Sequence, residues 1–160
     1  KKLLNGIFLI NIPSIKKKQQ FLINQGVNIF DPLNSSKYYT NPKIIIVLRD
    51  PKSVYFSMKS RKSFGYPGYK LDLFLKWYPK YMKNLKKINS NKILYIQFEK
   101  FFSNFTVEKK KLDKFLNIKM NYGENFDSEK TYNNLFKAKK NLTHGEIKKI
   151  NLALKKYLYW

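Results

Sequence analysis

One uninterrupted run of aliphatic residues, ended by an Arg-Asp-Pro sequence, constrains the fold of this chain more than any other feature. The run covers Lys43–Leu48 and reads Ile-Ile-Ile-Val-Leu after its lysine. Continuous apolar character of this kind is typical of a strand buried on both faces, as in a parallel sheet. Asp50 is a preferred N-cap and Pro51 a preferred first helical residue, so a helix is expected over 51–62. The segment 43–62 therefore predicts a strand, a tight turn and a helix.

The rest of the chain alternates strand-like and helix-like segments. Apolar runs predict strands at 6–12, 27–30 and 93–98. Helices are expected over 14–24, 71–88 and 106–116 and from the capping box Thr143–Glu146 onwards, whereas 31–42, 63–69 and 117–141 are expected mainly as loops. Within 71–88, Pro79 predicts a kink or break near Tyr78. This alternation indicates an α/β fold with a mainly parallel sheet flanked by helices.

The chain has the length and apolar content for one domain over 1–160. Two helical stripes are expected to face its core: Leu71, Phe74, Leu75, Tyr78, Met82 and Leu85, and later Ile147, Ile150, Leu154, Tyr157 and Leu158. The absence of cysteine excludes disulfides, thiolate zinc sites and a cysteine nucleophile. The only histidine, His144, lies in the last helix cap and is expected to be structural. No metal site is therefore expected.

The formal net charge of +23 is compatible with a polyanionic partner such as a phosphorylated cofactor, a sulfated glycan, an anionic lipid or nucleic acid. The favoured interpretation is compositional, because lysine greatly outnumbers arginine and is the weaker choice for bidentate phosphate recognition. On that interpretation most of the charge lies on a solvated surface. No apolar run reaches the roughly 18 to 20 residues that a membrane-spanning helix requires.

Arg49 stands where open α/β sheets bind their ligands, beyond the carboxyl end of a strand. A guanidinium there can hold a phosphate through two parallel hydrogen bonds, and the following helix directs its N–H groups and positive dipole end at the same space. Ser57, eight residues further on, can present a hydroxyl to the same anion. The residues alone are equally compatible with an ion pair between Arg49 and Asp50, with Ser57 as an ordinary helix residue.

The stretch Ile45–Ser57 resembles the strand-loop-helix element of sulfotransferases that use 3′-phosphoadenosine 5′-phosphosulfate (PAPS) as sulfate donor. In that family an apolar strand precedes Arg, then Asp or Asn, then Pro, with Ser eight residues after the Arg. The resemblance implies a partial sulfotransferase domain with a P-loop NTPase-like fold, in which Arg49 and Ser57 contact the 3′-phosphate of PAPS.

Two further segments support the resemblance. Lys92–Phe105, followed by Lys111–Ile118, resembles a family segment in which a strand ends in an aromatic residue and Glu, and a short loop leads to a helix closing with Phe-Leu-x-Ile. Glu99 takes the position of that Glu and is expected to be structural. The three lysines Lys137, Lys139 and Lys140 lie roughly where family members carry a basic loop over the 3′-phosphate, but a solvated lysine cluster is the favoured explanation of them.

One family element is missing. The family's glycine-containing loop for the 5′-phosphosulfate, Pro-Lys-Ser-Gly-Thr-Thr or similar, is absent from this sequence. Ile10–Ser14 instead resembles a Lys-Thr-Pro-Ser segment that follows that loop in bacterial members, so the loop is expected upstream of Lys1; the alternative is a relative from which the loop has been lost. The chain would then be N-terminally truncated, would carry the 3′-phosphate-binding half, and would be inactive alone. No catalytic base is assigned.

The resemblance implies transfer of a sulfuryl group from PAPS to a hydroxyl or amine of a glycan, lipid or small molecule. It also favours the cytoplasm, where bacterial PAPS is made, and no specific nucleic-acid partner. The main alternative is a non-enzymatic protein that binds polyanions, nucleic acid or sulfated glycan, through its net charge. The sequence disfavours this alternative because the charge is spread along the chain without a basic-aromatic motif. A P-loop kinase relative is disfavoured by the missing Gly-x-x-x-x-Gly-Lys-Ser/Thr.

Overall fold

The computed structural model describes residues 28, 31–60, 70–86, 88, 90–119 and 137–159. The elements expected at 6–12, 14–24, 27–30 and 63–69 lie outside these residues, apart from Asn28. In chain order the described elements are the helix α2 (Pro32–Ser35), the 3₁₀ turn η1 (Ser36–Tyr38), β1 (Ile44–Leu48), α3 (Pro51–Ser60), α4 (Leu71–Lys86), β2 (Ile93–Gln97), α5 (Phe98–Ser103), α6 (Phe105–Leu116), α8 (Lys137–Asn141), α9 (His144–Ala153) and the 3₁₀ turn η2 (Lys155–Tyr157).

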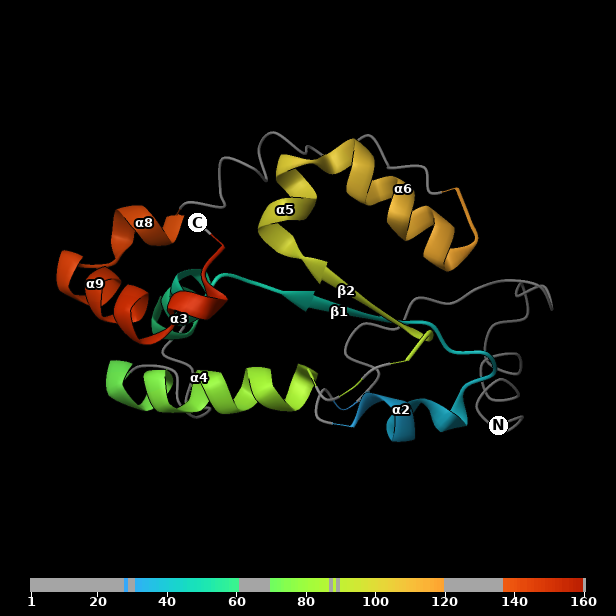
Figure 1. The fold of residues 1–160 in the computed structure, drawn as a ribbon, viewed down its shortest axis with the longest axis horizontal. Helices are drawn as coiled ribbons and strands as arrows, with labels where there is room; N and C mark the ends of the chain where they lie inside the picture. The colour runs from blue at the N-terminus through green and yellow to red at the C-terminus, as the bar shows by residue number, and fades with distance from the viewer. Residues whose placement is uncertain are drawn as a thin grey trace.

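The strands β1 and β2 pair in parallel, in a register that joins Ile44 to Ile93 and Leu48 to Gln97. The helices α3 and α4 form the crossover between them. In Figure 1, α2 and α4 lie on one side of the strands and α5 and α6 on the other, while α3, α8 and α9 gather beyond the strands' carboxyl ends. The described chain is thus a mixed α/β structure, mostly helical, around a two-stranded parallel sheet. This confirms the expected class in its coarse form.

The core forms where one face of the sheet meets α4 and α9, and the expected stripes supply its side chains. Its fully or almost fully buried members are Ile44, Ile46, Tyr55, Phe74, Tyr78, Met82, Leu85, Ile93, Ala138, Leu142, Ile150, Leu154 and Tyr157. Tyr78 and Tyr157 meet edge to face with ring centroids 5.7 Å apart, which joins α4 to the C-terminal segment. Both helical stripes predicted from the sequence therefore face the core.

Of the two outcomes predicted for Pro79, a kink or a break near Tyr78, the break does not occur, because α4 continues from Leu71 to Lys86 (Figure 1). Proline removes one helical hydrogen bond and crowds the preceding turn, at a cost of about 3 kcal/mol in a helix interior. Tyr78 and Met82, on either side of Pro79, are almost completely buried. Their packing offsets that cost and keeps the helix in one piece.

The expected burial of β1 on both faces is also only partly correct. Ile44 and Ile46 are each 5% exposed, but Val47 is 50% exposed. Burial of the β1 side chains therefore alternates along the strand, as in a sheet that has one covered face. Among the described residues, only β2 pairs with β1.

Three boundaries differ from expectation. The expected loop 31–42 contains α2 and η1, and the Asp31 side chain accepts a hydrogen bond from the Asn34 N–H at the start of α2. The expected loop 117–141 contains α8, whose Ala138 is buried. The expected strand 93–98 ends at Gln97, and α5 begins at once where a short loop was expected.

Within the described ranges, no helix is long and apolar enough to cross a bilayer.

The last helix begins where its capping box predicts. The Glu146 N–H donates to Thr143 Oγ1 at 3.2 Å, and the Thr143 N–H donates to Glu146 Oε2 at 2.9 Å. The helix ends earlier than expected, at Ala153, and η2 then turns the chain so that Tyr157 enters the core.

Replacing Thr143 with alanine should lower the free energy of unfolding by about 1 kcal/mol, because the Glu146 N–H loses its acceptor at the start of α9. Thr143→Ser keeps the hydroxyl and should lose less than half as much. Chemical denaturation of the three proteins measures the difference. Equal losses for serine and alanine would show that the hydroxyl does not stabilise the helix.

Candidate functional site

Arg49 is the first residue after β1 and lies at the carboxyl end of the sheet. Its guanidinium carbon lies 4.8 Å from the centre of the Phe98 ring, and Phe98 directly follows β2. Its backbone carbonyl accepts a hydrogen bond of 2.8 Å from the Tyr78 hydroxyl of α4. The ends of two neighbouring strands and one crossover helix together fix this residue.

The guanidinium of Arg49 forms no ion pair with a described acidic residue. Within the described residues, the ion pairs all use lysine, and Arg49 forms none. Its Nε is buried, and no described group accepts a hydrogen bond from it. The pairing with Asp50, left open by the sequence, is therefore not formed.

Asp50 instead ties the turn after β1 to the end of the chain. Its side chain is fully buried, and Oδ1 accepts from the Lys52 N–H at 2.8 Å, which confirms the expected helix cap. Its Oδ2 accepts from the Tyr159 N–H at 2.8 Å and lies 3.8 Å from Lys52 Nζ. The segment that follows η2 accordingly lies beside the turn after β1.

Glu99, at the start of α5, contacts the backbone of the same turn. It is 7% exposed, and its Oε1 accepts from the Asp50 N–H at 3.0 Å. Its Oε2 is buried without a hydrogen-bond partner among the described groups. Burial raises the pKa of Glu99, and the nearby charge of Asp50 adds to this, while the hydrogen bond from the Asp50 N–H and the charge of Arg49 act in the opposite direction.

Lys52 is a buried lysine that the sequence did not single out. It is 2% exposed, and its Nζ donates to Asn151 Oδ1 of α9 at 3.4 Å as well as lying near Asp50. Burial lowers the pKa of Lys52, Lys139 lowers it further, and Asp50 opposes the shift. Nothing local distinguishes Lys52 from the many solvated lysines of this chain, so the sequence held no signal for it.

Ser57 and the three lysines lie on elements that meet near this turn. Ser57 is partly buried on α3, one helical turn beyond the buried Ser53 and on the same face. Between Ser57 and Arg49, both of them described, there is no hydrogen bond. Lys137, Lys139 and Lys140 are exposed on α8, which packs against α3, and the charge of Lys139 acts on Lys52. The structure thus places these lysines on a helix that packs against α3.

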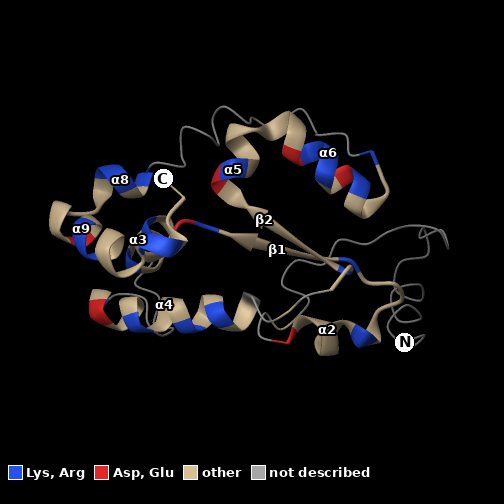
Figure 2. Cartoon of the chain, in the orientation of Figure 1, with Lys and Arg blue, Asp and Glu red and all other residues tan. Residues whose placement is uncertain are grey.

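Basic side chains are distributed over the helices rather than gathered on one of them. Figure 2 shows lysine on α3, α4, α5, α6, α8 and α9, with few acidic residues between them. This distribution fits the compositional interpretation of most of the net charge.

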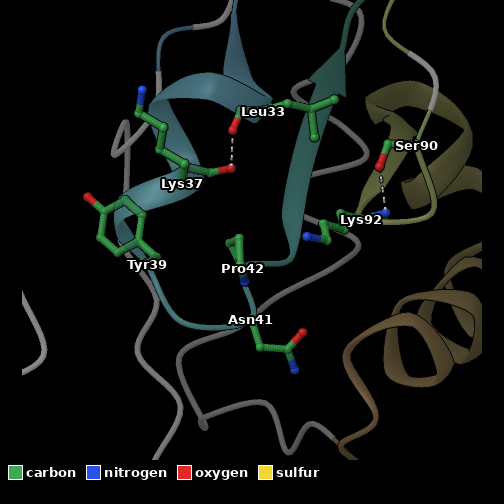
Figure 3. A pocket seen from close by; sticks show the side chains of 8 residues that line it. Leu33, Lys37, Tyr39, Asn41, Pro42, Ser90 and Lys92 are labelled. Carbon is green, nitrogen blue, oxygen red and sulfur yellow. Dashed lines mark hydrogen bonds between the residues drawn. The ribbon is translucent and has the colours of Figure 1, made fainter. Parts of the chain in front are cut away.

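A pocket of about 350 Å³ lies at the opposite end of the sheet from Arg49. Figure 3 shows it between the segments that lead into the two strands, with Pro42 before β1 and Lys92 before β2. The residues that line it are Leu33, Ser36, Lys37, Tyr39, Asn41, Pro42, Ser90 and Lys92. The pocket therefore lies at the amino ends of the strands, whereas the Arg49 guanidinium lies at their carboxyl ends. We favour the carboxyl end as the site, because α/β proteins bind ligands there and because it holds the unpaired guanidinium.

Comparison with known proteins assigns no family to this chain. No protein-family model matches it, and neither curated proteins nor solved structures show significant similarity to it. The structure itself defines the class only as a mixed α/β protein with a basic residue at the carboxyl end of a parallel sheet.

Proposed function

We propose that this chain is the donor-binding part of a PAPS-dependent sulfotransferase with a P-loop NTPase-like fold, and that Arg49 holds the 3′-phosphate of the donor. The observation that carries the proposal is the Arg49 guanidinium, which stands at the carboxyl end of β1 without an acidic partner among the described residues. A guanidinium that is partly exposed in this position can bind an anion, and phosphate is an anion whose geometry the guanidinium fork fits.

The surroundings of Arg49 support a nucleotide phosphate more than a diffuse polyanion. The helix α3 begins two residues later, so its N-terminal dipole adds to the positive potential. The Phe98 ring holds the guanidinium plane in place, which lowers the entropy lost when a ligand binds. Ser57 then supplies a hydroxyl to the same phosphate, and the lysines of α8 contribute long-range attraction.

Sulfuryl transfer needs more than binding of the 3′-phosphate of the donor. It requires a group that neutralises charge on the leaving phosphosulfate and a base that takes the acceptor's proton. We assign neither role to a described residue, because Glu99 and Lys52 are both buried and already hydrogen-bonded. The acceptor is a hydroxyl or amine of a glycan, lipid or small molecule.

The proposal predicts that phosphate position decides affinity. Adenosine 3′,5′-bisphosphate should bind at least about 10-fold more tightly than adenosine 2′,5′-bisphosphate, which has the same charge, and than adenosine 5′-monophosphate, because one charge-assisted contact is worth about 1.5–3 kcal/mol. Isothermal titration calorimetry of the chain with the three ligands measures this.

The same titration distinguishes the polyanion alternative. A protein that binds through net charge alone should hold the two bisphosphates equally and lose affinity steeply and in parallel as salt rises. That result would remove the case for a sulfotransferase site and leave a generic polyanion binder.

A further inference from the structure

The junction between β2 and α5 holds Arg49 at two points. Phe98 lies under the guanidinium, with its ring centre 4.8 Å from the guanidinium carbon. The next residue, Glu99, accepts a hydrogen bond from the Asp50 N–H, which belongs to the peptide that joins Arg49 to Asp50. One dipeptide, the first two residues of α5 directly after β2, therefore contacts both the side chain of Arg49 and the peptide that follows it.

The contact to the backbone is a buried one. The Asp50 N–H lies 3.0 Å from Glu99 Oε1, and both residues are almost completely buried. Removing the acceptor would leave that N–H without a partner in a place that water does not reach, which costs about 1–3 kcal/mol. The peptide after Arg49 consequently has one favourable orientation while Glu99 is present.

Glu99 is held in an environment that disfavours it. Its Oε2 is buried without a partner among the described groups, and a buried carboxylate oxygen without a hydrogen bond is expensive. Arg49 Nε is likewise buried without a described acceptor, and the charge of Arg49 acts on the Glu99 carboxyl. Unsatisfied buried groups of opposite charge on adjacent strand ends indicate that this region is arranged for a ligand, because fold stability alone would favour apolar side chains.

We infer that Glu99 is the positioning residue for Arg49: its carboxylate orients the peptide that follows Arg49, and together with Phe98 it aims the guanidinium at the ligand. The inference rests on the proposed function for the identity of that ligand. It assigns Glu99 no contact with the phosphate, and no proton transfer.

The sequence offers a direct readout, because Arg49 and Arg61 are the only arginines of the chain. Protein labelled with ¹⁵N-arginine should give two Nε–H signals, and Arg61→Lys identifies the one from Arg49. In the wild type, the Arg49 signal should be displaced upfield by the Phe98 ring below it. Glu99→Gln keeps an acceptor oxygen of the same shape and should retain this displacement, whereas Glu99→Leu should lose most of it.

Affinity provides the second readout. Glu99→Leu should weaken binding of adenosine 3′,5′-bisphosphate about 10-fold, the equivalent of one hydrogen bond to a charged group, and Glu99→Gln should restore affinity to within a few-fold of wild type. If the Arg49 signal and the affinity both stay at wild-type values in folded Glu99→Leu, Glu99 does not position Arg49.

Two measures keep the outcomes separable. If wild type does not bind the bisphosphate, the proposed ligand is wrong, while the Arg49 signals of the two variants still decide whether Glu99 positions the side chain. If Glu99→Leu does not fold, amide hydrogen exchange of wild type decides instead. The Asp50 N–H should then exchange at least about 100-fold more slowly than an unprotected amide, and rapid exchange would overturn the inference.

Discussion

Replacing Asp50 with alanine is expected to lower the free energy of unfolding by about 3–5 kcal/mol, enough to unfold a marginal domain. The fully buried carboxylate accepts from the N–H groups of Lys52 and Tyr159 and lies 3.8 Å from Lys52 Nζ. Without it, two N–H groups lose an acceptor and a buried ammonium loses its nearest negative charge. Urea denaturation followed by circular dichroism measures the loss.

Two further variants separate these contributions. Asp50→Asn keeps the shape and one acceptor oxygen, so it should cost less than Asp50→Ala. Adding Lys52→Met to Asp50→Ala removes the buried ammonium that has lost the Asp50 carboxylate and should recover part of the lost stability, because burying a charge without its opposite charge is the larger penalty. If Lys52→Met recovers nothing in the alanine background, the ammonium is not what makes the loss large.

Local sequence signals predicted local structure here because each depends on residues within one helical turn. Asp50 and Pro51 begin α3, and the capping box begins α9. The same Asp-Pro signal stands at Asp31 and Pro32, where it begins α2. The prolines and Ser/Asn residues around it indicated a loop, so a correct local signal was outweighed by composition.

The errors in the fold arose where tertiary packing decides the outcome. Pro79 would break an isolated helix, but buried neighbours keep α4 continuous. The five residues of α8 are too few to form a stable helix in water, and packing against α3 supports them. No pattern confined to either segment contains that information.

In the candidate site, too, local sequence signals were predictive and long-range contacts were not. The place of Arg49 follows from a strand that ends in Arg-Asp-Pro together with the rule for ligand sites in parallel sheets. Its partners could not be predicted, because Glu99 lies 49 residues from Asp50 in sequence and Tyr159 lies 109 residues from it. The sequence therefore left open whether Asp50 would pair with Arg49 or with other groups.

Replacing Arg49 with alanine is expected to weaken binding of adenosine 3′,5′-bisphosphate about 100-fold, because the two parallel hydrogen bonds of a guanidinium to phosphate together contribute about 3 kcal/mol. The fold should persist, since the side chain forms no ion pair with a described residue and its contact with Phe98 is worth about 0.5–1 kcal/mol. Calorimetric titration gives the affinity, and thermal denaturation of the same samples gives the stability.

The chain offers a matched control for this substitution. Arg61→Ala changes the net charge by the same amount at the only other arginine and should leave the affinity within about 2-fold of wild type. Arg49→Lys keeps the charge but loses the planar fork, so it should fall between wild type and alanine, with a loss of about 10-fold. If the two alanine variants weaken binding equally, net charge and not the guanidinium beyond β1 holds the ligand. If only Arg49→Ala weakens binding, the ligand is held by the Arg49 guanidinium, which Phe98 and the turn at Asp50 keep in place.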